Sequence, residues 1–95
     1  MLRLRFYRDP ETGQPHIHRH DVTEHEVEDV LRQVGEDRWG RGSSRAALGR
    51  TRGGRYLRIV YLRDPDAHSL FVVTAYELQG KPLTAYKRRQ RKKRR

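Results

Sequence analysis

Cysteine is absent from this chain of 95 residues, and tryptophan and methionine occur once each. Without cysteine there is no disulfide framework and no thiolate metal site, so we expect a cytoplasmic protein. Apolar residues make up only 34% of the chain. No apolar run approaches the roughly 20 residues that span a membrane, and the first residues already read as a strand, so we expect no signal peptide. The sequence predicts one domain with a modest core.

Positive charge is unevenly distributed along the chain. The formal net charge is +10, and residues 87–95 contribute eight basic side chains, all except Gln90. Removing those eight charges from +10 leaves +2 for residues 1–86. A dense basic run attracts phosphates and also anionic membrane surfaces. Because this run lacks the apolar anchors of a membrane-binding helix, we expect a nucleic-acid partner, no membrane, and a single domain over residues 1–86 followed by a basic tail.

Three successive strands are predicted in the middle of the chain, over residues 45–51, 55–63 and 69–77. The second and third are dense in β-branched and aromatic residues, which suit a half-buried pleated surface. The connecting residues 52–54 and 64–68 are rich in glycine, proline and aspartate, which favour turns. Residues 2–7 alternate apolar and polar side chains, the pattern of a strand with one buried face. An antiparallel meander with one additional strand is therefore expected.

The best-specified element is a helix that begins after Thr23. The Thr23 hydroxyl and the Glu26 carboxylate can each accept from the other residue's backbone amide, which is a capping box. Val22 and Val27 flank the cap as a hydrophobic staple. An apolar stripe at helical spacing follows, formed by Val27, Val30, Leu31 and Val34. We expect Gly35 to end the helix in a left-handed conformation.

The remaining segments complete the predicted architecture. Residues 36–44 read as a polar loop, in which Trp39 is either a lid over the core edge or an exposed contact residue. Residues 80–82 break the chain before a short terminal helix, which the basic tail extends or frays. One face of that helix would present Leu83, Tyr86 and Gln90. The order β-α-β-β-β-α predicts an α+β domain with a mostly antiparallel four-stranded sheet and a helix packed on one face.

Alternation along the strands assigns side chains to two faces of this sheet. The face toward the helix would hold Leu2, Leu4, Phe6, Leu48, Leu57, Ile59, Phe71 and Val73. The opposite face would hold Arg3, Arg5, Tyr7, Arg45, Tyr56, Arg58, Thr74 and Tyr76. Arginine forks bind phosphate and aromatic rings stack on unpaired bases, so this composition suits nucleic acid. An ordinary solvated sheet face has the same composition.

Candidate chemical groups are few. His16, His18 and His20 alternate in a segment that we expect to be extended, with the three rings on one side. A metal needs three or four ligands, and no cysteine or carboxylate has a fixed spacing to these histidines, so we predict no metal. One of them can instead serve as a general acid or base, or simply as a polar loop residue. Residues 50–55 lack a phosphate-loop or dinucleotide pattern, so no cofactor is expected. The remaining residue types suffice for metal-free RNA cleavage by a neighbouring 2′-hydroxyl.

Several motifs together resemble the RelE-like toxin superfamily, and its BrnT branch most. They are the helix start Arg-His-Asp-Val-Thr-Glu-His-Glu-Val at residues 19–27, the strand pair at residues 45–51 and 54–61, and the strand Phe-Val-Val-Thr-Ala-Tyr at residues 71–76. The chain departs from that branch at Asp21, where a glycine is usual, and at Tyr76, where an arginine is usual. The resemblance implies an endoribonuclease that acts on free or ribosome-associated mRNA and is neutralised by an antitoxin protein.

The leading hypothesis is therefore a metal-independent, cofactor-free endoribonuclease of toxin type. Arg55 and Arg58 would hold phosphate, His20 or Glu77 would act as base, and Tyr76 or Tyr86 as acid or stacking platform. Contacts to nucleic acid are predicted for Arg3, Arg5, Arg45, Arg50, Arg55, Lys87, Arg88, Arg89 and Arg91. Two alternatives remain: a non-catalytic nucleic-acid-binding module, and a subunit whose exposed face binds a protein such as an acidic antitoxin.

Overall fold

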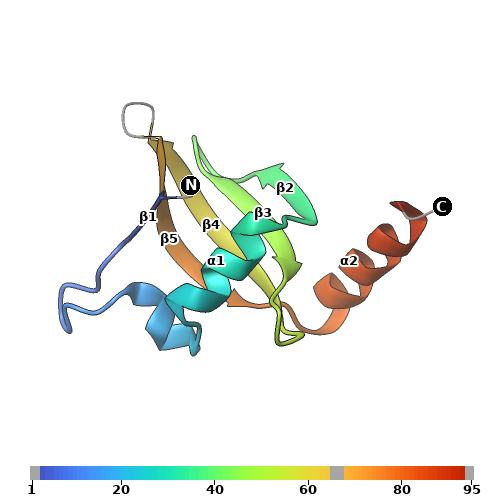
Figure 1. The fold of residues 1–95 in the computed structure, drawn as a ribbon, viewed down its shortest axis with the longest axis horizontal. Helices are drawn as coiled ribbons and strands as arrows, with labels where there is room; N and C mark the ends of the chain where they lie inside the picture. The colour runs from blue at the N-terminus through green and yellow to red at the C-terminus, as the bar shows by residue number, and fades with distance from the viewer. Residues whose placement is uncertain (1–2, 65–67, 94–95) are drawn as a thin grey trace.

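The computed structural model describes residues 3–64 and 68–93. Its elements in chain order are β1 (Arg3–Phe6), the 3-10 helix η1 (His16–His20), α1 (Glu24–Arg32), β2 (Glu36–Trp39), β3 (Arg45–Arg50), β4 (Tyr56–Asp64), β5 (Ser69–Glu77) and α2 (Gly80–Lys93). The strands form one sheet in the order β1-β5-β4-β3-β2, with α1 across one face and α2 beside it (Figure 1). The α+β class and the meander β3-β4-β5 are confirmed.

Two features of the sheet correct the prediction. The residues expected as a polar loop include a fifth strand, β2, which pairs antiparallel with β3. Its sequence Glu-Asp-Arg-Trp carries no apolar alternation, so pattern alone could not reveal it. At the other edge β1 pairs parallel with β5. The sheet is therefore five-stranded and mixed. The parallel pairing could not be predicted, because the alternation of side chains in one strand does not specify the direction of its neighbour.

The main core lies between α1 and the sheet. It buries Ile17, Val22, Val27, Val30, Ala47, Leu57, Ile59, Tyr61, Val72 and Ala75. The capping box is confirmed, because Thr23 Oγ1 accepts from the Glu26 amide at 3.2 Å and Glu26 Oε1 accepts from the Thr23 amide at 3.0 Å. The predicted helix end is wrong: α1 stops at Arg32, and Gly35 does not have a positive φ. Val34 follows the helix and is 39% exposed.

A β-bulge shifts the predicted faces of β5. Val60 lies opposite Thr74, whereas the next residue, Tyr61, lies opposite Val72. Because β5 has one extra residue at this point, its side-chain alternation changes phase relative to β4. Val72 and Ala75 consequently face α1, and neither Phe71 nor Val73, which were expected there, belongs to the core.

Two further residues lie on the opposite side from that predicted. Leu48 belongs to a second buried cluster with Leu78 and Tyr86, away from α1. Arg45 lies directly opposite the buried Tyr61 and therefore on the α1 side.

The face of the sheet opposite α1, called the open face below, presents Arg5, Tyr56, Arg58, Val60, Leu62, Phe71, Thr74 and Tyr76. Leu2, residues 65–67 of the predicted turn, and residues 94 and 95 of the predicted tail lie outside the described residues. The predicted terminal helix is present, and residues 87–93 extend it. No helix in the described ranges is long and apolar enough to cross a membrane.

Candidate nucleic-acid interface

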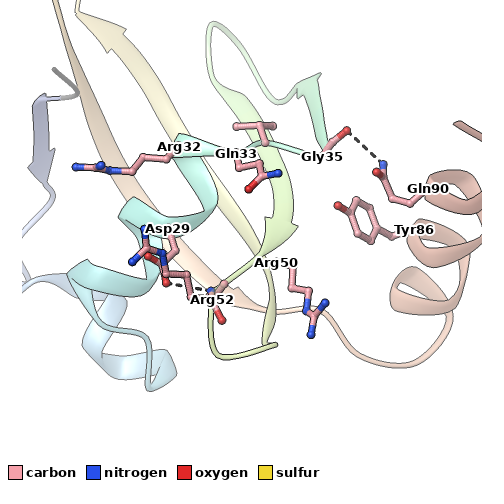
Figure 2. Close-up of a pocket in the computed structure, with 10 residues that line it drawn as sticks. Asp29, Arg32, Gln33, Gly35, Arg50, Arg52, Tyr86 and Gln90 are labelled. Atoms are coloured by element: carbon pink, nitrogen blue, oxygen red, sulfur yellow. Dashed lines mark hydrogen bonds between the residues drawn. The ribbon is translucent and has the colours of Figure 1, made fainter. Parts of the chain in front are cut away.

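A groove separates α2 from the β3–β4 hairpin and the end of α1. It consists of two adjoining hollows of about 570 Å³ and about 290 Å³ that share Arg50, Tyr86 and Gln90. The first extends toward Asp29 and Arg52, and the second is lined also by Tyr56, Lys87 and Arg91. We call this feature the α2 groove. Figure 2 shows its larger part, with the Arg50 side chain between the hairpin and α2.

The position of α2 depends on contacts with residues 35 and 36. Tyr86 is 4% exposed, and a Cβ atom added to Gly35 would lie 1.9 Å from its hydroxyl oxygen. Gln90 Nε2 donates to the Gly35 carbonyl at 3.2 Å, and Figure 2 shows both side chains pointing from α2 toward Gly35. Arg89 donates to Glu36 at 2.5 and 3.0 Å, and this hydrogen bonding lowers the pKa of Glu36 below its usual value. Gly35 thus accommodates α2 rather than ending α1.

The α2 groove combines cations with an aromatic ring. The Arg50 guanidinium and the Lys87 ammonium lie over the Tyr56 ring, 5.9 and 5.0 Å from its centroid. In the part of the chain that the structure describes, Arg50, Lys87 and Arg91 form no ion pair with a carboxylate. Their charge is therefore available to a ligand. Proteins that bind single-stranded nucleic acid combine cations with aromatic rings in this way, because the cation binds phosphate and a base can stack on the ring.

A second cluster continues from the groove onto the open face. Arg58 follows Tyr56 by two residues on β4, so their side chains share a face about 7 Å apart. Arg58 lies directly opposite Tyr76 on β5. The Tyr76 ring is 6.0 Å from the His20 ring, and His20 is 5.4 Å from His16. This cluster of Arg58, Tyr76 and His20 is called the Arg58 cluster.

Arg58 is half-buried, and its charge is uncompensated. Its Nε atom is buried and has no hydrogen-bond partner among the described residues. The Thr74 hydroxyl, a diagonal neighbour across the β4–β5 pair, is also buried and unpartnered in that part of the chain. A buried polar group without a partner costs free energy, more so when it is charged. A bound anion near Arg58 would offset that cost.

The structure brings three of the five predicted catalytic residues together and separates the other two. His20, Arg58 and Tyr76 form the Arg58 cluster. Glu77 lies on the α1 side of the sheet, where it accepts from Arg55 Nε at 3.3 Å. Tyr86 is buried against β3 in the second cluster, at the base of the α2 groove.

The predicted phosphate ligand Arg55 has structural partners instead. It donates to the Asp21 carbonyl at 2.6 Å, to Glu26 at 3.0 Å and to Glu77 at 3.3 Å. These bonds join the start of α1 to the ends of β4 and β5. With its guanidinium satisfied by two carboxylates, Arg55 has little charge left for a ligand.

The other residues predicted to contact nucleic acid fall into two groups, those that form an ion pair with a carboxylate and those that do not. Arg5 pairs with Asp64 at 2.8 Å, Arg45 with Asp37 at 3.0 Å, and Arg89 with Glu36. Within the described ranges, carboxylates are absent from ion-pair distance of Arg3, Arg50, Lys87, Arg88 and Arg91. Of this second group, Arg50, Lys87 and Arg91 line the α2 groove.

The histidine segment was predicted to be extended, but it forms the 3-10 helix η1. The three rings therefore do not point the same way: His16 and His20 contact each other, whereas His18 Nε2 lies 2.7 Å from Glu24 Oε1. Pro15 precedes this helical turn, Asp21 ends it with a φ of 57°, and Ile17 anchors it in the core. Across residues 3–64 and 68–93, no group of three or more histidine or acidic side chains could hold a metal ion.

Sequence reasoning missed the roles of Gly35, Thr74 and Gln90. Gln90 was visible as the single uncharged residue in the basic run. The tight approach of Tyr86 to Gly35 and the unpartnered hydroxyl of Thr74 arise from tertiary packing and leave no sequence pattern.

Comparison of this chain with protein-family models, curated proteins and solved structures gives no match in any of the three. Function is therefore inferred from the geometry of the site and from the motif resemblance.

Proposed function

We propose that this protein binds single-stranded RNA and cleaves it as a metal-independent endoribonuclease of toxin type. The observation that carries the proposal is the continuity of unpaired cations and aromatic rings from the α2 groove to the Arg58 cluster. Arg50, Lys87 and Arg91 supply positive charge along this path. Arg58 supplies a half-buried cation beside two groups that can transfer protons.

In the proposed reaction, the 2′-oxygen of one nucleotide attacks the adjacent phosphorus. A 2′,3′-cyclic phosphate forms while the bond to the 5′-oxygen of the next nucleotide breaks. His20 accepts the proton from the 2′-hydroxyl, and Tyr76 donates a proton to the departing 5′-oxygen. Arg58 stabilises the negative charge that accumulates on the non-bridging phosphate oxygens. The contact between the Tyr76 and His20 rings allows both groups to reach one phosphodiester.

The resemblance to the RelE-like superfamily, and to its BrnT branch in particular, supports the same proposal. It extends it to mRNA, free or on the ribosome, as the substrate in the cytoplasm, and to a neutralising antitoxin protein as partner. Tyr76 stands where the BrnT branch has an arginine. In this chain, Arg58 on the facing strand provides the cation that Tyr76 does not.

RNA cleavage in the presence of a metal chelator tests the proposal, with and without ribosomes. Wild-type protein should cut RNA and leave 2′,3′-cyclic phosphate ends. His20→Ala, Tyr76→Phe and Arg58→Ala should each slow cleavage by about 100-fold or more, the usual contribution of a general acid or base for the first two and of a group that stabilises transition-state charge for Arg58. Arg8→Ala is the matched control, because Arg8 is exposed, donates to the Gly13 carbonyl at 2.8 Å and lines neither hollow of the groove. RNA left intact by the wild-type protein, together with normal growth of cells that express it, would rule out the nuclease.

A non-catalytic RNA-binding module is the second candidate. The unpaired cations of the groove support binding whether or not the Arg58 cluster performs chemistry. RNA bound with salt-dependent affinity but never cut would favour this candidate.

A further inference from the structure

Trp39 is the single tryptophan of the chain and, at 73%, the most exposed large apolar side chain among the described residues. It lies at the end of β2, directly opposite Arg45. A hollow of about 370 Å³ adjoins it, at the opposite end of β3 from the α2 groove. The hollow is lined by Trp39, Ser43, Arg45, Leu62 and Arg63.

One face of the indole is fixed by a chain of polar contacts. The Arg45 guanidinium lies over the ring at 4.3 Å from its centroid. Arg45 Nε donates to Asp37 at 3.0 Å, and the hydroxyl of the buried Tyr61 donates to the same carboxylate at 2.8 Å. Burial, together with the hydrogen bond to Asp37, raises the pKa of the Tyr61 phenol, so that it remains a donor. These contacts connect the buried Tyr61 to the indole and orient the ring before any ligand binds.

Two of the residues that line the hollow beside the indole, Arg45 and Arg63, are cationic. Arg63 is exposed and, among the residues described, has no carboxylate partner, and Leu62 is the only aliphatic residue that lines the hollow. In a protein-binding hot spot, surrounding contacts exclude water from the central side chain, whereas Trp39 is 73% exposed and lies near the exposed Arg63. A ligand that has both an aromatic ring and a negative charge fits this site, because its ring can stack on the indole while its charge meets the arginine.

We infer that Trp39 is a stacking platform for one unpaired nucleobase of RNA, with Arg63 beside the adjoining phosphate. This site deepens the proposed function and rests on it, because it supplies a second contact that is separate from the α2 groove. Stacking on the face of the indole opposite Arg45 requires an unstacked base, so the site selects single-stranded over duplex RNA.

The test uses the emission of Trp39, which has no background from another tryptophan. A short oligoadenylate with 2′-O-methyl groups, which block cleavage, is titrated into the full chain, and anisotropy of a dye on the RNA reports binding separately. Saturable quenching of Trp39 emission is expected, in parallel with the anisotropy. Trp39→Ala should weaken binding roughly tenfold, and Trp39→Phe should recover part of that loss because a ring remains. The same sequence in a duplex should bind without quenching.

Three results would overturn the inference, and they are distinguishable. RNA binding by anisotropy with unchanged Trp39 emission and an unaffected Trp39→Ala variant would remove the stacking site and leave the proposed function intact. Absence of RNA binding altogether would remove both. A shift of Trp39 emission with protein concentration alone would assign the indole to contact with another protein chain.

Discussion

Replacing Gly35 by alanine separates the shape of the α2 groove from its charge. The substitution changes no ionisable group, but the added Cβ would lie 1.9 Å from the Tyr86 hydroxyl oxygen, 2.9 Å from its Cζ and 3.2 Å from the Leu48 carbonyl oxygen. Tyr86 is buried and the Leu48 carbonyl belongs to β3, so the strain is relieved most easily by moving α2. Every cation of the helix is retained while its position relative to the Tyr56 ring changes.

The magnitude follows from the cost of overpacking. Forcing extra volume into a packed site typically costs about 1–3 kcal/mol. At about 1.4 kcal/mol per tenfold change, the ratio of docked to undocked α2 falls by a factor of about 5 to 150. If RNA requires the assembled groove, its affinity falls by up to that factor.

Two measurements are needed for this test. Amide hydrogen exchange of residues 80–93 reports whether α2 has undocked, and anisotropy of a labelled single-stranded RNA reports affinity. Gly53→Ala is the matched control, because an added Cβ there meets only the Thr51 hydroxyl at 3.8 Å. Affinity that stays at the wild-type value while exchange shows α2 undocked would refute the groove and leave the basic charge alone as the binding determinant.

Three further predictions concern charge, pH and local stability. The double substitution Lys87→Ala with Arg91→Ala should make the negative slope of log affinity against log salt shallower by about 1.4, whereas Lys81→Ala on the same helix should leave the slope unchanged; an equal effect of both would contradict the groove. Because the pKa of Glu36 is lowered in the folded protein, its carboxylate adds stability above the ordinary value of 4.5 that is lost as the pH falls below it. Urea unfolding of Glu36→Gln should therefore differ from wild type near neutral pH, and the difference should shrink as the pH falls below 4.5 and through the lowered pKa of Glu36; a difference that stays constant with pH would be contrary to this linkage. Thr23→Ala should destabilise the protein by about 1 kcal/mol in the same assay, and Thr23→Ser should restore the loss, unless the capping box contributes nothing.

Local signals in the sequence predicted the parts of the fold that local interactions determine. The capping box at Thr23, the turn residues between the strands and the alternation in β4 each act within a few residues, so their consequences could be read directly. β2 could not be predicted, since its stability comes from partners distant in sequence. Asp37 pairs with Arg45 and Tyr61, and Glu36 pairs with Arg89.

The candidate site was predicted by residue type more successfully than by position. Arginine, tyrosine and histidine were the expected chemistry, and His20, Arg58 and Tyr76 do lie together. The sequence did not reveal that carboxylates occupy Arg55 and Arg89, because ion-pair partners come from distant segments. The bulge at Val60 and Tyr61 likewise reversed side-chain orientations in β5 that simple alternation had assigned.

The central claim is that RNA lies along one continuous surface, from the α2 groove to the Arg58 cluster. Chemical-shift mapping of backbone amides, with a 2′-O-methyl RNA that cannot be cleaved, tests it directly. Shifts are expected on Arg50, Tyr56, Arg58, Tyr76 and the α2 residues from Lys87 to Arg91, in addition to those at the separate Trp39 site. Shifts confined to the solvent side of α2, with β4 and β5 unaffected, would contradict it.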